Sequence, residues 1–126
     1  MSKRVLAIED NLSNMILISR VVEAEGYQLL QAEDGNAALD LLAVEKPDLI
    51  LLDINIPGIH GLELAGRLKA DGRLADVPLI ATTANVLQGD RERCLEAGCD
   101  DYLPKPLDIR DLRRMMRRYL ATDSLD

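Results

Sequence analysis

The sequence predicts one α/β domain with a parallel sheet covered by helices on both faces. Short apolar runs alternate along the chain with segments whose apolar residues recur at helical spacing, in the order βαβαβαβαβα. The apolar runs are continuous rather than alternating with polar residues, which is typical of strands buried on both faces. The 126 residues are enough for one hydrophobic core and hardly more.

The five predicted strands differ in how clearly the sequence indicates them. Residues 5–8 and 49–52 are entirely apolar and are the clearest strands. Weaker runs predict the other three strands at residues 27–32, 77–81 and 102–103. In an open sheet of this kind, ligands bind outside the carboxyl ends of the strands, so the residues that follow these runs are the first candidates for a site.

Helices are predicted between the strands and after the last one. Residues 14–25 precede Gly26 and residues 91–97 precede Gly98, and glycine commonly ends a helix. Apolar residues at helical spacing predict the second helix before Pro47 and the third after Gly61. The apolar stripe of the last helix is formed by Leu112, Met115, Met116 and Tyr119.

Composition and charge exclude several classes of function. The chain carries 15 basic and 22 acidic residues, so its net charge is −7. This charge argues against non-specific binding of nucleic acid or of an anionic membrane surface. The chain contains no Phe or Trp, and its aromatic residues are Tyr27, Tyr102 and Tyr119. The core is therefore expected to be aliphatic.

The sequence favours a cytoplasmic protein. No stretch approaches the ~20 apolar residues that a membrane-spanning helix requires. The apolar run near the N-terminus has four residues, 5 to 8, which is too short for a signal peptide. Cys94 and Cys99 match no zinc-binding spacing and are expected to be inert, partly buried residues of a reducing compartment, with a redox pair as the alternative.

Acidic residues follow two of the predicted strands. Glu9 and Asp10 end the first strand and Asp53 ends the third, so three carboxylates converge if these strands are neighbours. Carboxylates this close repel one another unless a cation neutralises them, and Mg²⁺, or Mn²⁺, takes oxygen ligands of this kind. Thr83 after the fourth strand and Lys105 after the fifth add a hydroxyl donor and a positive charge at the same edge.

This combination of groups is typical of phosphoryl transfer, with Asp53 as the nucleophile that becomes an aspartyl phosphate. Each residue also has an ordinary explanation. Glu9 and Asp10 could cap the following helix, Asp53 could be a solvated loop acid, and Lys105 a surface lysine. Thr82 is a second candidate for the hydroxyl. The joint placement at one edge favours the functional interpretation.

At this point the sequence resembles the receiver domain of bacterial response regulators, from about residue 3 to residue 120. The resemblance rests on Glu9-Asp10-Asn11, on the segment 46–53 with Pro57 and Gly61, on Thr83-Ala84, and on the segment 102–106. Residues 89–100 are similar to stand-alone receivers of the DivK type and also to receivers attached to hybrid histidine kinases.

The resemblance implies a flavodoxin-like (βα)5 fold with strand order 2-1-3-4-5, a receiver domain at residues 1–121 and a short tail at residues 122–126. It implies that Asp53 accepts the phosphoryl group and that Lys105 and Thr83 bind it. Glu9, Asp10, Asp53 and the backbone carbonyl of Asn55 would hold the metal ion. The peptide bond between Lys105 and Pro106 is expected to be cis.

The resemblance also implies a switch read by partner proteins. Tyr102 would turn inward when Thr83 moves, although ordinary strand packing of its ring is the alternative. Asn55 and Asn85 would tune the lifetime of the phosphoryl group. The partners would be a sensor histidine kinase or phosphatase, or a histidine phosphotransfer protein, together with effectors at the face formed by the fourth helix, fifth strand and fifth helix.

Further features refine this interpretation. The part from Pro106 onward carries a net charge of +1, against −8 before it, so the arginines at 110, 113, 114, 117 and 118 either meet acidic partners or form an ordinary solvated face. No output domain follows the receiver segment, so DNA binding is not expected. The only histidine, His60, is expected to be exposed and is a poor phosphodonor.

Other functions remain as alternatives. A phosphatase of the haloacid dehalogenase class would need a second acid where Asn55 stands, and a flavin carrier would need aromatic residues and a phosphate-binding loop. The remaining alternatives are a receiver excised from a hybrid histidine kinase and a pseudo-receiver that binds partners without phosphorylation. In the favoured receiver interpretation the chain is a phosphoacceptor and not an enzyme acting on other substrates.

Overall fold

The computed structural model describes residues 3–84 and 89–120, and these residues form a five-stranded parallel sheet with five helices. The strands pair in the order β2-β1-β3-β4-β5, which confirms the expected topology. The strands are β1 (Arg4–Ile8), β2 (Gln28–Ala32), β3 (Leu49–Asp53), β4 (Leu79–Thr83) and β5 (Asp101–Pro104). The helices are α1 (Leu12–Ala24), α2 (Gly35–Leu42), α3 (Gly61–Ala70), α4 (Asp90–Glu96) and α5 (Ile109–Leu120).

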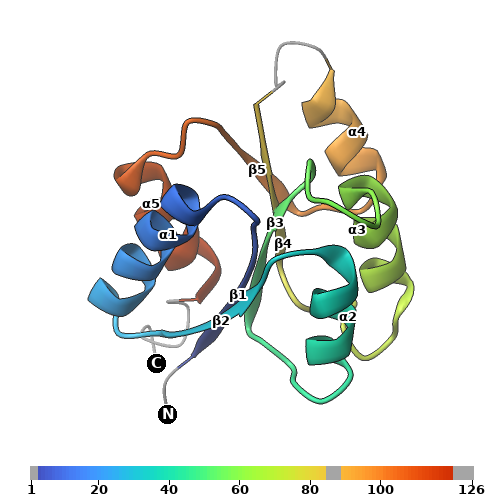
Figure 1. Ribbon diagram of the computed structural model, residues 1–126, viewed down its shortest axis with the longest axis horizontal. Helices are drawn as coiled ribbons and strands as arrows, with labels where there is room; N and C mark the ends of the chain where they lie inside the picture. Colours follow the sequence, from blue (N-terminus) through green and yellow to red (C-terminus); the bar gives the residue numbers. More distant parts are fainter. Residues whose placement is uncertain (1–2, 85–88, 121–126) are drawn as a thin grey trace.

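The helices cover both faces of the sheet. Helices α1 and α5 lie on one face, and α2, α3 and α4 lie on the other (Figure 1). Successive residues of the central strand β3 therefore alternate between two cores: Leu49 and Leu51 pack with α1 and α5, whereas Ile50 and Leu52 pack with the other three helices. All five residues of β3 are buried, as a strand covered on both faces requires.

Two elements, α1 and β4, begin two residues away from their predicted starts. Helix α1 begins at Leu12 rather than residue 14, because the Asn11 side chain accepts a hydrogen bond from the Asn14 N–H and caps the helix. Strand β4 begins at Leu79 rather than residue 77. Pro78 has no N–H to donate, and the Val77 N–H instead closes a turn onto Leu74.

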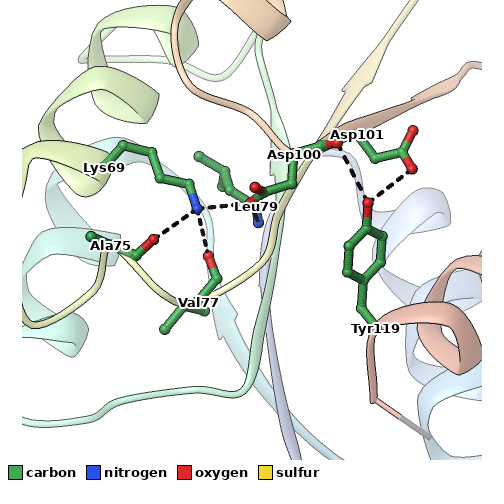
Figure 2. A network of polar contacts seen from close by, with 7 residues as sticks. All are labelled: Lys69, Ala75, Val77, Leu79, Asp100, Asp101 and Tyr119. Atoms are coloured by element: carbon green, nitrogen blue, oxygen red, sulfur yellow. Dashed lines mark hydrogen bonds and ion pairs between the residues drawn. The ribbon is translucent and has the colours of Figure 1, made fainter. Parts of the chain in front are cut away.

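A polar network joins the amino-terminal ends of β4 and β5 to α3 and α5 (Figure 2). It lies at the edge of the sheet opposite the acidic residues. Lys69 Nζ, from α3, donates to Val77 O at 2.8 Å and to Asp100 Oδ2 at 2.7 Å. The same Asp100 oxygen accepts the Leu79 N–H at 2.8 Å. On the other face of the sheet, the Tyr119 hydroxyl of α5 donates to Asp101 Oδ2 at 3.1 Å.

Both cysteines are buried thiols. Cys94 and Cys99 are free, and burial raises the pKa of both thiols, that of Cys99 to about 12. They are therefore poor nucleophiles, in agreement with the inert role that was predicted. Among the residues described here, no helix is long and apolar enough to cross a membrane. The cytoplasmic location stays a prediction, as does the boundary between the domain and its tail, which lies outside the described residues.

Candidate functional site

Three carboxylates meet at the carboxyl edge of the sheet. One oxygen each from Glu9, Asp10 and Asp53 lies within 4.8 Å of the other two. Strands β1 and β3 are hydrogen-bonded neighbours, so the residues that end them are brought together. Glu9 and Asp53 are 2% and 3% exposed, whereas Asp10 is open to solvent. The convergence that the sequence predicted is therefore confirmed, with Asp10 on the outer side of the cluster.

Lys105 lies between the two buried acids. Its ammonium nitrogen donates to Asp53 Oδ2 at 2.9 Å and lies 3.3 Å from Glu9 Oε1. The Lys105 N–H bonds to Thr83 O, which fixes the start of this segment beside β4, and the Lys105–Pro106 peptide is cis as expected. Burial lowers the pKa of Lys105, but Asp53 and Glu9 outweigh burial and hold this pKa above its ordinary value.

One carboxylate oxygen of Glu9 is placed to bind a ligand. Its Oε2 accepts the Asn11 N–H at 3.1 Å, while Oε1, although close to Lys105, has no well-aligned hydrogen bond within the described chain. Burial, together with the nearby charge of Asp53, raises the pKa of Glu9 above its ordinary value, against the opposing effects of Asn11 and Lys105. A buried carboxylate oxygen beside two further carboxylates fits a hard divalent cation, which would relieve this repulsion.

The loop after β3 shapes the floor of the site. The Asn55 N–H donates to Asp53 Oδ1 at 2.9 Å, so both oxygens of Asp53 are oriented, one by the backbone and one by Lys105. The loop returns to α3 through Gly61, whose N–H bonds to Ile54 O. A Cβ at Gly61 would lie 2.2 Å from Ile54 Cα, so only glycine allows this close approach.

The Thr83 hydroxyl does not bond to the carboxylate cluster in this structure. It is fully buried and donates to Asp90 Oδ2 at 2.7 Å. Asp90, the first residue of α4, also forms an ion pair with Arg93. The alternative hydroxyl, on Thr82, is buried without a hydrogen bond among the described residues.

Asp90 is a residue that the sequence interpretation did not assign to the site. The segment that contains it contributed to the resemblance, but its burial at 4% exposure was not foreseen. The sequence signal was weak, because an acid in the first turn of a helix is usually a solvated residue favoured by the helix dipole.

The remaining predicted residues lie around this edge. Tyr102 pairs with Ala81 across the β4–β5 ladder, and its half-buried ring packs against the core beneath α2, α3 and α4. The Arg91 guanidinium lies 5.5 Å from the centre of this ring. His60 is exposed, as expected, and its Nδ1 accepts the Leu62 N–H at the start of α3. Asn85 lies outside the described residues.

Comparisons with known proteins agree with this geometry. Residues 5–117 match the response regulator receiver domain. The chain is 41% identical over 121 residues to the polar-differentiation response regulator DivK of Brucella anthropi, covering 96% of this chain and 98% of DivK.

Two solved structures show how similar the folds are. The receiver domain of a sensor histidine kinase from Pseudomonas aeruginosa PAO1, with a magnesium ion in its active-site cleft, has 35% identity and a TM-score of 0.88, with 97% of this chain and 100% of that chain covered. The Mn²⁺-bound response regulator Rcp1 has 25% identity and a TM-score of 0.85, with 95% and 96% covered. From its sequence, its sheet order and its cluster of acids, the chain belongs to the response regulator receiver domain family.

Proposed function

We propose that this chain is a phosphorylation-dependent switch in which Asp53 accepts a phosphoryl group from a partner's phosphohistidine. Glu9, Asp10, Asp53 and the backbone carbonyl of Asn55 hold Mg²⁺ or Mn²⁺. The observation that carries the proposal is the contact of Lys105 with two buried carboxylates, at 2.9 Å from Asp53 and 3.3 Å from Glu9. Three carboxylates beside one ammonium group leave the site negatively charged, and a dication would offset this charge so that an anionic phosphoryl group can enter.

Asp53 acts as the nucleophile. One carboxylate oxygen attacks phosphorus, and the P–O bond forms as the P–N bond to the partner's imidazole breaks. The ring nitrogen keeps the bonding electron pair, and the ring leaves as neutral imidazole because its other nitrogen carries a proton. The bound metal ion supplies positive charge that offsets the oxygens of the transferring group. Lys105 then transfers its hydrogen bond from Asp53 Oδ2 to a phosphoryl oxygen, and Thr83 supplies a second donor.

Two amides tune how long the phosphoryl group persists. Asn55 and Asn85 stand two residues after Asp53 and Thr83, where an amide can orient the attacking water. Asn55 is exposed beside Asp53, so it is accessible to such a water. Asn55→Ala is therefore expected to slow loss of the phosphoryl group, and an unchanged rate of dephosphorylation would contradict this role.

The chain acts through partners rather than as an enzyme on other substrates. It promotes only its own phosphorylation and dephosphorylation, and the phosphodonor is a histidine kinase or a histidine phosphotransfer protein. Effectors read the face formed by α4, β5 and α5, where the four residues of β5, Asp101 to Pro104, line an open pocket with Asp111, Arg114 and Met115 of α5. The net charge of −7 makes DNA and anionic membranes unsuitable partners.

The arginines of α5 are largely occupied within the chain. Arg113 and Arg117 pair with Glu25, Arg114 with Asp111 and Arg118 with Asp101. These pairs favour the solvated-face interpretation of the basic helix over a dedicated surface for acidic partners. Specificity at this face is therefore expected to depend on its shape more than on its net charge.

Incubation with acetyl phosphate tests the proposal. The intact mass of the wild type is expected to rise by one phosphoryl group when Mg²⁺ is present and to stay unchanged in EDTA. Asp53→Asn should remove the adduct, while Asp40→Asn, an exposed acid on α2, should retain it. An adduct that persists in Asp53→Asn, or that forms without a divalent cation, would contradict the assignment.

A further inference from the structure

Asp90 is a buried acid outside the carboxylate cluster. Among the described residues the buried acids are Glu9, Asp53 and Asp90, and Asp90 is 4% exposed. A buried carboxylate is costly unless it is paired and hydrogen-bonded. Asp90 meets this requirement with an ion pair to Arg93 and a hydrogen bond of 2.7 Å from the Thr83 hydroxyl.

The Thr83 hydroxyl has a single proton to donate. In this structure that proton is donated to Asp90 Oδ2. In the proposed function the same hydroxyl donates to a phosphoryl oxygen on Asp53. One proton cannot make both bonds at full strength, so the two arrangements exclude one another.

We infer that Asp90 is a positioning residue that holds the Thr83 hydroxyl in its unphosphorylated arrangement, so that binding of a phosphoryl group must break the Thr83–Asp90 hydrogen bond. This inference rests on the proposed function, because it takes Thr83 as a ligand of the phosphoryl group. A hydrogen bond to a charged acceptor is stronger than one between neutral groups, so the bond biases the switch toward the unphosphorylated state.

Two arginines of α4, Arg93 and Arg91, bear on the breaking of the Thr83–Asp90 hydrogen bond. Arg93 pairs with Asp90 within α4 and does not depend on the Thr83 hydroxyl, so release of Thr83 need not leave the carboxylate without a cation. Arg91, the next residue, lies over the ring of Tyr102. The first turn of α4 therefore contacts both predicted switch residues, and the movement of Thr83 is passed directly to the start of this helix.

Binding of beryllofluoride, a stable mimic of the phosphoryl group, tests the inference in the full chain. Affinity is measured by isothermal titration calorimetry with Mg²⁺ in excess, for the wild type, Asp90→Ala and the matched control Glu92→Ala. Glu92 is an acid of the same helical turn with its side chain 64% exposed. Asp90→Ala is expected to bind about tenfold more tightly than the wild type, and Glu92→Ala to bind as the wild type does.

A double-mutant cycle shows whether Asp90 acts through Thr83. In a Thr83→Val background no hydroxyl has to be released, so Asp90→Ala is expected to leave beryllofluoride affinity unchanged. The same tightening in both backgrounds would overturn the inference, because it would assign the effect to the packing of α4. Unchanged affinity of Asp90→Ala in the wild-type background would overturn it as well.

Two further outcomes are distinguishable. If circular dichroism shows that Asp90→Ala is unfolded, Asp90→Asn replaces it, because the amide oxygen still accepts from Thr83 but without charge. Its affinity is then expected to rise about threefold, and no rise would overturn the inference. A wild type that does not bind beryllofluoride would overturn the proposed function itself, whereas binding by the wild type with no change in the variants would overturn only the role of Asp90.

Discussion

Lys105 is the cation that allows Glu9 and Asp53 to be buried side by side. The two carboxylates are 2% and 3% exposed, and the ammonium group lies within ion-pair distance of both. The sequence predicts that four side chains lie close together, because residues that end parallel strands meet at one edge of the sheet. They are Glu9, Asp10, Asp53 and Lys105. The hydrogen bond between Thr83 and Asp90 could not be predicted, because it depends on where the start of α4 lies relative to the end of β4.

Lys105→Met is expected to lower the free energy of unfolding by about 2 kcal/mol in EDTA, because it leaves two buried carboxylates without their cation. The loss stays below that of a fully buried pair, since Lys105 is 18% exposed. Urea denaturation measures it. Lys46→Met, which removes an exposed pair with Asp76, is the control and should cost less than about 1 kcal/mol. Equal losses in the two variants would contradict the account.

Mg²⁺ is expected to stabilise the wild type by about 1.4 kcal/mol at a concentration ten times its dissociation constant. The cation binds the folded carboxylate cluster, which the unfolded chain does not assemble. Urea denaturation with Mg²⁺ and with EDTA measures this difference. Asp10→Asn together with Asp53→Asn should abolish it, and a gain that survives this double substitution would place the metal elsewhere.

The secondary structure elements follow from local patterns, and their ends follow from hydrogen bonds that only the structure shows. The stripe at 112, 115, 116 and 119 predicted α5, and the continuous apolar run predicted β3. The start of α1 was wrong by two residues, because the Asn11 cap was not recognised as its first signal. The predicted start of β4 was two residues too early, because Pro78 has no N–H to donate to a neighbouring strand.

Two glycines of α3 are expected to respond in opposite directions to alanine. Gly61→Ala places a Cβ 2.2 Å from Ile54 Cα and must displace the loop that carries Asn55, costing about 1–3 kcal/mol. A Cβ at Gly66 meets nothing within 4 Å, so Gly66→Ala should stabilise the helix by about 0.5–1 kcal/mol. Thermal unfolding of both variants measures the effects. Stabilisation by Gly61→Ala would contradict the close approach.

The contribution to stability of the Tyr119–Asp101 contact, which joins α5 to β5, is expected to depend on pH. Burial and the hydrogen bond to Asp101 raise the pKa of Tyr119 above its ordinary value of 10, so the folded state holds this proton more tightly than the unfolded chain. The stabilisation is therefore fully present below about pH 10 and is lost as the pH rises through the folded-state pKa. The stability advantage of the wild type over Tyr119→Phe should accordingly shrink in alkaline urea titrations. An advantage independent of pH would contradict this.

At the scale of the whole molecule, the proposed site lies at one edge of the sheet, and a polar network joins the elements at the opposite edge. The acids lie at the carboxyl ends of the strands, while Lys69 and Asp100 fasten the amino-terminal ends of β4 and β5. The presence of a parallel sheet was predictable from the alternating pattern. Its strand order was not, because five strands of similar composition do not specify their neighbours, and the order followed from the family resemblance.

Borohydride trapping after reaction with acetyl phosphate and Mg²⁺ tests the central claim most directly. Borohydride reduces an aspartyl phosphate to homoserine, and peptide mass spectrometry locates the reduced residue. The account predicts homoserine at position 53, at the end of β3, and at neither Asp10 nor Asp90. Trapping at another acid, or a phosphoryl group retained on His60, would contradict it.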